Sequence, residues 1–198
     1  MASKFFSNHN FSKRKNISGF FIWSLLLIFF LVITIWFLNQ HNISNNMSIK
    51  VGSKVPEFSL PDQDEKMVNI MDFVGKNNLV IYFYPKDDTP GCTAEACSFR
   101  DQFVVFQEYG AEVFGISADS VEKHKNFAEK HRLPFRLLSD VNKRVRKLFG
   151  VPSDLLGLLP GRVTYIVDKT GTVRHIFNSQ LNAEKHVTEA LQILEKLK

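Results

Sequence analysis

A short apolar run that ends at a proline restricts the fold more than any other feature of the chain. Residues 79–84 are apolar or aromatic and stop at Pro85. Beyond the proline, apolar residues recur at helical spacing: Ala96, Phe99, Phe103 and Phe106. The pattern predicts a strand at 79–84, a turn, and a helix from about 91 to 109.

Both cysteines of the chain lie in this predicted helix, and the first lies at its start. Thr89 suits the N-cap position and Pro90 the first helical position, which places Cys92 in the first turn. Unpaired backbone N–H groups and the positive end of the helix dipole favour a thiolate there. This stretch is therefore the candidate active site.

The spacing of the two cysteines limits how they can react with each other. Five residues along an ideal helix separate two Cα atoms by about 8.6 Å, whereas a disulfide needs roughly 4.4–6.8 Å. Cys92 and Cys97 can therefore bond only after the first turns unwind. On spacing alone, a core residue and a chance surface thiol are an equally good interpretation. A metal site is disfavoured, because no third cysteine or helix-spaced histidine pair completes a ligand set.

The motif Pro85-x-x-x-Thr89-x-x-Cys92 resembles the active-site motif of the peroxiredoxins. The stretch 89–101 resembles their Q, or bacterioferritin-comigratory, branch, and 150–162 is similar to its cyanobacterial and plastid members. The likeness covers residues 51–198. It implies a thioredoxin-like fold of the peroxiredoxin variant and a monomeric thiol-dependent peroxidase, of the atypical two-cysteine kind, that needs no cofactor.

The resemblance also implies roles for five residues. Cys92 is the peroxidatic cysteine, whose thiolate attacks a hydroperoxide and becomes a sulfenic acid. Cys97 is the resolving cysteine, and thioredoxin or a thioredoxin-like reductant recycles the resulting disulfide. Thr89 caps the helix and binds the peroxide, Arg162 stabilises the thiolate, and Pro85 shields it. Without the resemblance, Thr89 would be interpreted as a helix cap alone, Arg162 as a solvated arginine and Pro85 as a turn proline.

Other polar residues near the candidate site receive no catalytic role. Asp87 and Asp88 are expected to point outward, because carboxylates beside the first cysteine would oppose thiolate formation. His124 and His131 lie among lysines and are assigned to a solvated helix face. The leucine-rich loop 155–159 is expected to plug the core, with an exposed apolar patch as the alternative.

Strands alternate with helices after residue 50, which predicts an α/β sheet. Periodicity alone supports no finer fold class than an α/β sandwich. The strands are expected near 58–60, 66–70, 79–84, 113–117, 135–138, 163–167 and 172–177. The helices are expected over 91–109, from the cap Ser120 to 131, over 141–149, and from Ala183 onward.

The N-terminal fifty residues differ from the rest in charge and hydropathy. They carry five basic residues and no acidic one, whereas residues 51–198 carry twenty of each sign. The net charge of +5 therefore comes from the N-terminus alone, which argues against a nucleic-acid partner.

The run 17–38 is apolar and long enough to cross a bilayer. We expect a basic N-terminus at 1–16, a transmembrane helix at 17–38, a flexible linker at 39–50 and the catalytic domain at 51–198. A cleaved signal peptide is the alternative. The basic residues before the run predict a single-pass membrane protein, its N-terminus cytoplasmic and its catalytic domain opposite, in a periplasm or organelle lumen.

Three functions compete at this point. The first is a membrane-anchored peroxidase acting on hydrogen peroxide and organic hydroperoxides. The second is a membrane-anchored thiol-disulfide oxidoreductase, but such enzymes use a CxxC pair and this chain has a five-residue step. The third is a non-catalytic, redox-regulated binding module.

Overall fold

The computed structural model describes residues 28–29, 31–36, 49–154 and 159–198. The chain divides into two units, Met1–Asn46 and Met47–Lys198. In the first unit, residues 28–29 and 31–36 are helical and exposed, and the remainder of the expected membrane helix 17–38 lies outside the described residues. Within the described ranges, no helix combines the length and the apolar character that crossing a membrane requires.

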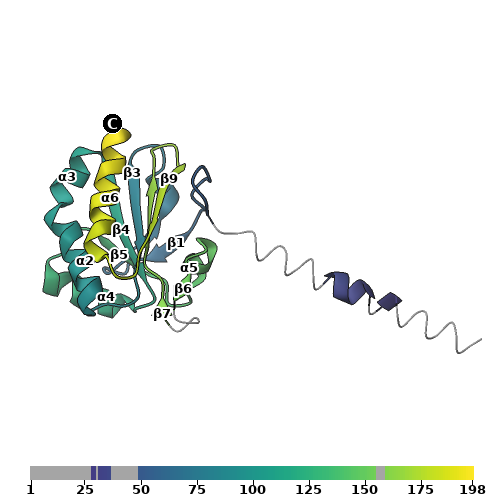
Figure 1. Ribbon diagram of the computed structural model, residues 1–198. Coiled ribbons are helices and arrows are strands. Elements are labelled where there is room, and N and C mark those ends of the chain that lie inside the picture. Colours follow the sequence, from purple (N-terminus) through teal and green to yellow (C-terminus); the bar gives the residue numbers. More distant parts are fainter. Residues whose placement is uncertain (1–27, 30, 37–48, 155–158) are drawn as a thin grey trace, which may run out of the picture. The chain divides into compact units, whose positions relative to one another are not determined.

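The second unit is built on a mixed five-stranded sheet (Figure 1). The strand order is β5-β4-β3-β8-β9, in which β3 pairs parallel with β4 and antiparallel with β8. The bounds of these strands are β3 Asn78–Phe83, β4 Ala111–Ser117, β5 Arg136–Ser139, β8 Val163–Val167 and β9 Val173–Asn178.

Helices and short strands surround this sheet. The helices are α2 (Pro90–Asp101), α3 (Phe103–Glu108), α4 (Val121–His131), α5 (Arg144–Leu148), α6 (Ala183–Lys196) and the 3-10 helix η1 (Ile70–Asp72). The short strands are β1 (Ser59–Pro61), β2 (Met67–Asn69), β6 (Ser153–Asp154) and β7 (Leu159–Pro160), paired β1 with β2 and β6 with β7.

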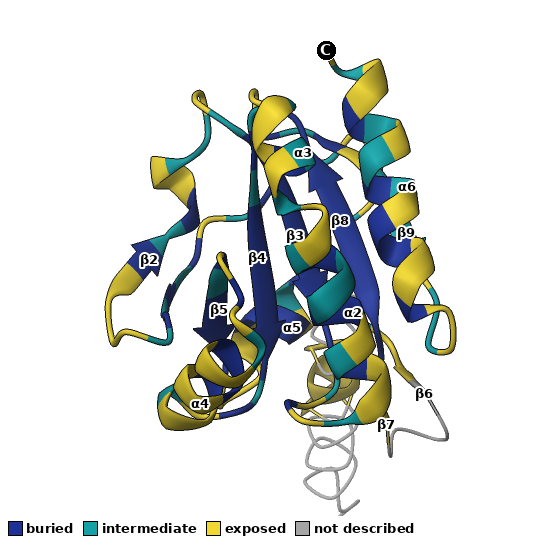
Figure 2. Ribbon diagram, turned by 90° about the vertical axis from the view of Figure 1, so that its left-hand side faces the viewer, coloured by how far each residue is buried: buried dark blue, intermediate teal, exposed yellow. Residues whose placement is uncertain are grey.

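Strand β3 is buried on both faces and separates two cores (Figure 2). Side chains alternate across a strand, so Val80 and Tyr82 pack toward α2, α3, α4 and α6. Leu79 and Ile81 face the other way, toward the N-terminal hairpin and α5. Because β3 ends between these two cores, the loop that follows it begins between them.

The predicted α/β architecture is confirmed, and the departures from it have local causes. The expected helix over 91–109 is two helices, because Gln102 leaves helical geometry at φ −105° and ψ 9°. The apolar periodicity continues across this break and hides it. The expected helix over 141–149 begins only at Arg144, because the N-cap Lys143 has left-handed backbone geometry. Asp140 accepts the N–H groups of Val145 and Arg146 in the first turn.

The loop expected to plug the core is only partly described. Residues 155–158 lie outside the described residues. Leu159, in the short strand β7, is 41% exposed, so the core prediction is wrong at that position.

Candidate active site

Cys92 lies where the sequence places it, in the first turn of α2 just after the buried strand β3. Thr89 is the N-cap, with extended backbone geometry, and Pro90 opens the helix. The first helical hydrogen bond runs from the N–H of Thr93 to the carbonyl of Thr89 at 2.8 Å. The N–H groups of the first turn therefore remain available around the Cys92 thiol, which is only 1% exposed.

Arg162 brings a fixed positive charge to this thiol from the residue just before β8. Its Nη2 donates to Cys92 Sγ at 3.2 Å, and its side chain is 4% exposed. A guanidinium remains protonated in proteins. A guanidinium at hydrogen-bonding distance from a sulfur is the kind of neighbour that favours a thiolate.

Glu95 shares the same guanidinium. It lies three residues after Cys92, on the same face of α2, and accepts a hydrogen bond from Arg162 Nη1 while being fully buried. Burial raises the pKa of Glu95 to about 8, although the charge of Arg162 opposes the shift. At neutral pH the carboxyl is therefore mostly protonated, which leaves the charge of Arg162 free for the thiolate.

His186 of α6 closes this network from the opposite side. Its Nε2–H donates to the carbonyl of Ser179 at 2.9 Å, and its Nδ1 lies 2.7 Å from the Thr164 hydroxyl and 3.6 Å from Glu95 Oε1. Burial lowers the pKa of His186 to about 4, so the ring is neutral. Nδ1 therefore accepts the hydroxyl proton of Thr164. Neither Glu95 nor His186 was predicted from the sequence. For Glu95 a signal was present, because a residue three positions after Cys92 lies on the same face of the helix.

Thr89 and Pro85 occupy their predicted positions but make few polar contacts. The Thr89 hydroxyl donates to the carbonyl of Lys86 at 3.1 Å and does not cap the helix. Pro85 is half-buried and follows Tyr84, whose carbonyl accepts a hydrogen bond from Arg146 at 2.8 Å. Arg146 also donates to the carbonyl of residue 161 at 2.9 Å. This buried arginine therefore ties the end of β3 to the segment that carries Arg162, and no sequence pattern pointed to it.

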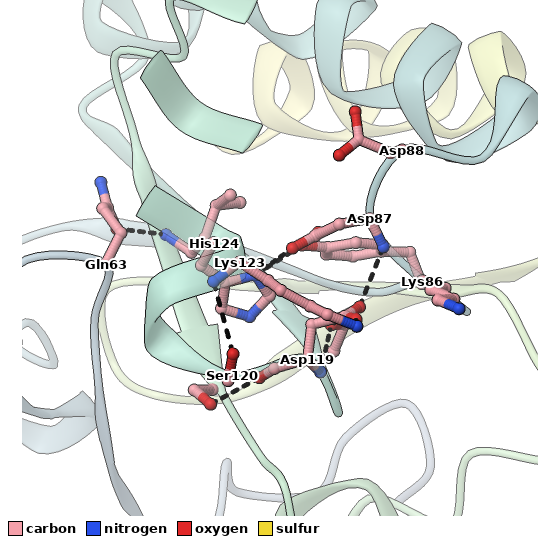
Figure 3. A network of polar contacts seen from close by, with 12 residues as sticks. Gln63, Lys86, Asp87, Asp88, Asp119, Ser120, Lys123 and His124 are labelled. Atoms are coloured by element: carbon pink, nitrogen blue, oxygen red, sulfur yellow. Dashed lines mark hydrogen bonds and ion pairs between the residues drawn. The ribbon is translucent and has the colours of Figure 1, made fainter. Parts of the chain in front are cut away.

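The prediction that Asp87 points outward is wrong (Figure 3). Its buried carboxylate accepts the Tyr84 hydroxyl at 2.7 Å and lies 2.7 Å from Nδ1 of His124. His124 is fully buried, so its assignment to a solvated face is also wrong. The backbone N–H of Asp87 donates to buried Asp119 at 2.9 Å. The pair therefore fixes the loop before α2, and the Asp87 carboxylate is held by Tyr84 and His124.

Cys97 lies farther along α2 in a different environment. It is half-buried, and its Sγ is 3.9 Å from Nδ1 of His131, which is likewise not on a solvated face. Asp88 is exposed, as predicted, and pairs with Lys130 at 2.6 Å. Both cysteines are free thiols on an intact helix, and five positions on such a helix hold their Cα atoms about 8.6 Å apart.

A buried thiol at a helix N-terminus, fixed against an arginine and followed by a second thiol on the same helix, defines a cysteine-based redox enzyme. Comparisons with known proteins agree. Residues 51–176 match the AhpC/TSA family. Peroxiredoxin Q of Sedum lineare, a chloroplast protein, is 53% identical over 156 residues, which cover 78% of this chain and 83% of that protein. The Arabidopsis thaliana chloroplast peroxiredoxin Q is 50% identical over 147 residues, which cover 74% of this chain and 68% of that protein.

Solved structures place the fold in the same group. Peroxidoxin BcpB from Mycobacterium tuberculosis has a TM-score of 0.70 and 38% identity, covering 76% of this chain and 99% of that one. Peroxiredoxin Q of Xylella fastidiosa has a TM-score of 0.69 and 27% identity, covering 75% and 96%. The chain therefore belongs to the AhpC/TSA family, in its peroxiredoxin Q branch. The predicted thioredoxin-like peroxiredoxin fold and the predicted thiol peroxidase are confirmed.

The predicted single-pass membrane localisation is wrong. The peroxiredoxin Q proteins of Sedum lineare and Triticum aestivum, 53% and 54% identical to this chain, are chloroplast proteins by name. The part of the chain that the structure describes holds no helix able to span a membrane. An apolar run was sufficient for the prediction but does not establish a membrane-spanning helix.

Proposed function

We propose that this thiol-dependent peroxidase reduces hydrogen peroxide and organic hydroperoxides through Cys92. The thiolate attacks the terminal peroxide oxygen, the O–O bond breaks, and the departing alkoxide or hydroxide takes a proton to leave as alcohol or water. Cys92 becomes a sulfenic acid. The observation that carries this proposal is the contact of 3.2 Å between Arg162 Nη2 and the buried Cys92 Sγ.

Arg162 has two tasks in this proposal. It stabilises the thiolate before the reaction, and it donates to the peroxide oxygens as negative charge moves onto them. Thr89, whose hydroxyl donates to the carbonyl of Lys86, supplies a further hydrogen bond to the peroxide. Pro85, half-buried at the end of the preceding strand, shields the thiolate from water.

Cys97 resolves the sulfenic acid in the second step. Its thiolate attacks the sulfur of Cys92, the S–S bond forms, and the S–O bond breaks to release water. Because a disulfide needs Cα atoms closer than about 7 Å, the start of α2 unwinds during this step. A dithiol of the thioredoxin type then reduces the disulfide by exchange and returns both thiols.

The alternative, a thiol-disulfide oxidoreductase, finds less support. In such an enzyme the two thiols close and open within an intact helix, whereas Cys92 and Cys97 are too widely spaced on α2. The bacterioferritin comigratory protein of Xanthomonas campestris, a solved relative, has alkyl peroxide reduction activity, which favours the peroxidase. We also propose that residues 51–198 act as a monomeric domain without the N-terminal residues.

Peroxide consumption coupled to thioredoxin and its reductase tests the proposal. Cys92→Ser should abolish turnover, because it removes the thiol that Arg162 contacts. Cys97→Ser should consume about one equivalent of peroxide per chain and then stop. If Cys97→Ser turned over with thioredoxin at the wild-type rate, the resolving role would be wrong. Active Cys92→Ser protein would overturn the proposed nucleophile.

A further inference from the structure

Cys97 lies beside a histidine that the proposed function leaves unused. Nδ1 of His131, in the last turn of α4, is 3.9 Å from Cys97 Sγ, within the longer range that hydrogen bonds to sulfur occupy. Two contacts orient the histidine. Arg100 of α2 donates to its backbone carbonyl at 2.9 Å, and its ring packs edge-on against Phe127 with centroids 4.9 Å apart.

A carboxylate faces the other nitrogen of the same ring. Asp88 Oδ1 lies 3.7 Å from His131 Nε2, a buried atom with no hydrogen-bond partner among the described residues. A carboxylate attracts an N–H group, so Asp88 favours the neutral tautomer with its hydrogen on Nε2. In that tautomer the lone pair of Nδ1 faces Cys97. Asp88 is ionised, since its hydrogen bond with Lys130 lowers its pKa.

We infer that His131 is the general base that takes the proton of the Cys97 thiol, with Asp88 as the positioning residue. This inference rests on the proposed resolving role of Cys97. The S–H proton passes to Nδ1, and the Cys97 thiolate attacks the sulfur of the Cys92 sulfenic acid. As the S–S bond forms, the departing hydroxide takes the proton from His131, which yields water and a neutral ring.

The charges around His131 favour this transfer. From α2 the thiol of Cys97 and the guanidinium of Arg100 face the site, and the two groups interact. Asp88, in the loop before α2, also faces His131. Lys130, which lies beside His131 on α4, pairs with Asp88 and offsets part of its negative charge. A thiolate formed at Cys97 is therefore stabilised by Arg100 and the imidazolium together.

A proton acceptor is useful here because an ordinary thiol is only a few per cent thiolate at neutral pH. Deprotonation before α2 unwinds gives a nucleophile that is ready when Cys92 becomes accessible. The chain thus gives each cysteine its own activating group, an arginine for Cys92 and a histidine for Cys97.

Rapid mixing with hydrogen peroxide, acid quenching and mass spectrometry tests the inference in the full chain. In His131→Ala, we expect Cys92 to oxidise at the wild-type rate and the disulfide to form about tenfold more slowly. Sulfinic acid at Cys92 should rise, because the sulfenic acid lives longer. Added imidazole should restore the rate. His175→Ala, at a histidine that pairs with Glu189 instead, is the control and should change nothing.

Asp88→Asn supplies a second test that does not depend on the folding of the histidine variant. Asp88 has a left-handed backbone at φ 56°, which asparagine also tolerates. This variant should slow disulfide formation about threefold. Wild-type rates in both variants, without imidazole dependence, would overturn the inference. Thioredoxin-dependent turnover of Cys97→Ser would instead overturn the proposed function, which keeps the two failures apart.

Discussion

Cys92 and Cys97 share one helix but have opposite surroundings. Cys92 is sealed from solvent and touches a guanidinium whose charge does not depend on pH. Cys97 is half-exposed and touches an imidazole, a group that can gain and lose a proton. In the proposed cycle, this difference suits the first thiol to a small peroxide, and the second to proton transfer followed by movement.

Removing the fixed charge should produce the largest difference between the two thiols. Arg162→Met keeps the volume of the side chain and removes the hydrogen bonds to Cys92. The second-order rate of Cys92 oxidation by hydrogen peroxide should fall by about 10²–10³-fold, the usual effect of losing such a donor. Stopped-flow kinetics measures it, and alkylation of Cys97 should be unchanged.

A matched arginine separates this effect from a general loss of positive charge. Arg136→Met removes a half-exposed arginine that pairs with Glu112 at 3.4 Å, and it should leave Cys92 oxidation within twofold of wild type. A tenfold or greater loss in Arg136→Met, or none in Arg162→Met, would show that the Arg162 contact does not activate the thiolate.

Glu95 should produce a smaller effect that depends on pH. Its pKa is raised from 4.5 to about 8 by burial, so the carboxylate that forms above pH 8 competes with the Cys92 thiolate for Arg162. The rate of Cys92 oxidation should therefore fall a few-fold between pH 7 and 9. Glu95→Gln keeps the shape without the charge and should remove this decline.

The same carboxyl makes a prediction for stability. A raised pKa means that its contribution to stability is fully present below pH 4.5 and is lost as pH rises to about 8. His186 has the opposite sign, because its pKa is lowered from 6.5 to about 4 and its contribution is lost as pH falls through that window. Urea titrations of Glu95→Gln should show a weaker loss of stability between pH 4.5 and 8. An unchanged slope would contradict the shift assigned to Glu95.

The local signals around Cys92 were sufficient to predict its position. A buried strand, a proline and the Thr89-Pro90 pair fix where α2 begins, and these are short-range effects of backbone geometry. The resemblance to peroxiredoxins pointed to Arg162, which is distant in sequence. Its contact with Glu95 spans 67 positions and therefore forms only in the folded chain.

The two histidines of α4 were missed although a signal was present. Positions 124, 127, 128 and 131 form one stripe at helical spacing, and Phe127 and Ala128 mark it as the buried face. The neighbouring lysines suggested solvent instead. Burial of His124 depends on Asp87, a partner from the loop before α2. A polar pair of this kind cannot be found from the pattern of either segment alone.

The proposed catalytic cycle requires the two thiols to meet only when α2 opens, and hydrogen exchange of the reduced and the disulfide forms measures that opening. Amides from about residue 89 to 99 should lose protection on oxidation, because an intact helix keeps the Cα atoms about 8.6 Å apart. Amides of β3 and β8 should be unchanged and serve as internal controls. Equal protection of α2 in both forms, with the disulfide confirmed by mass, would contradict the proposed cycle.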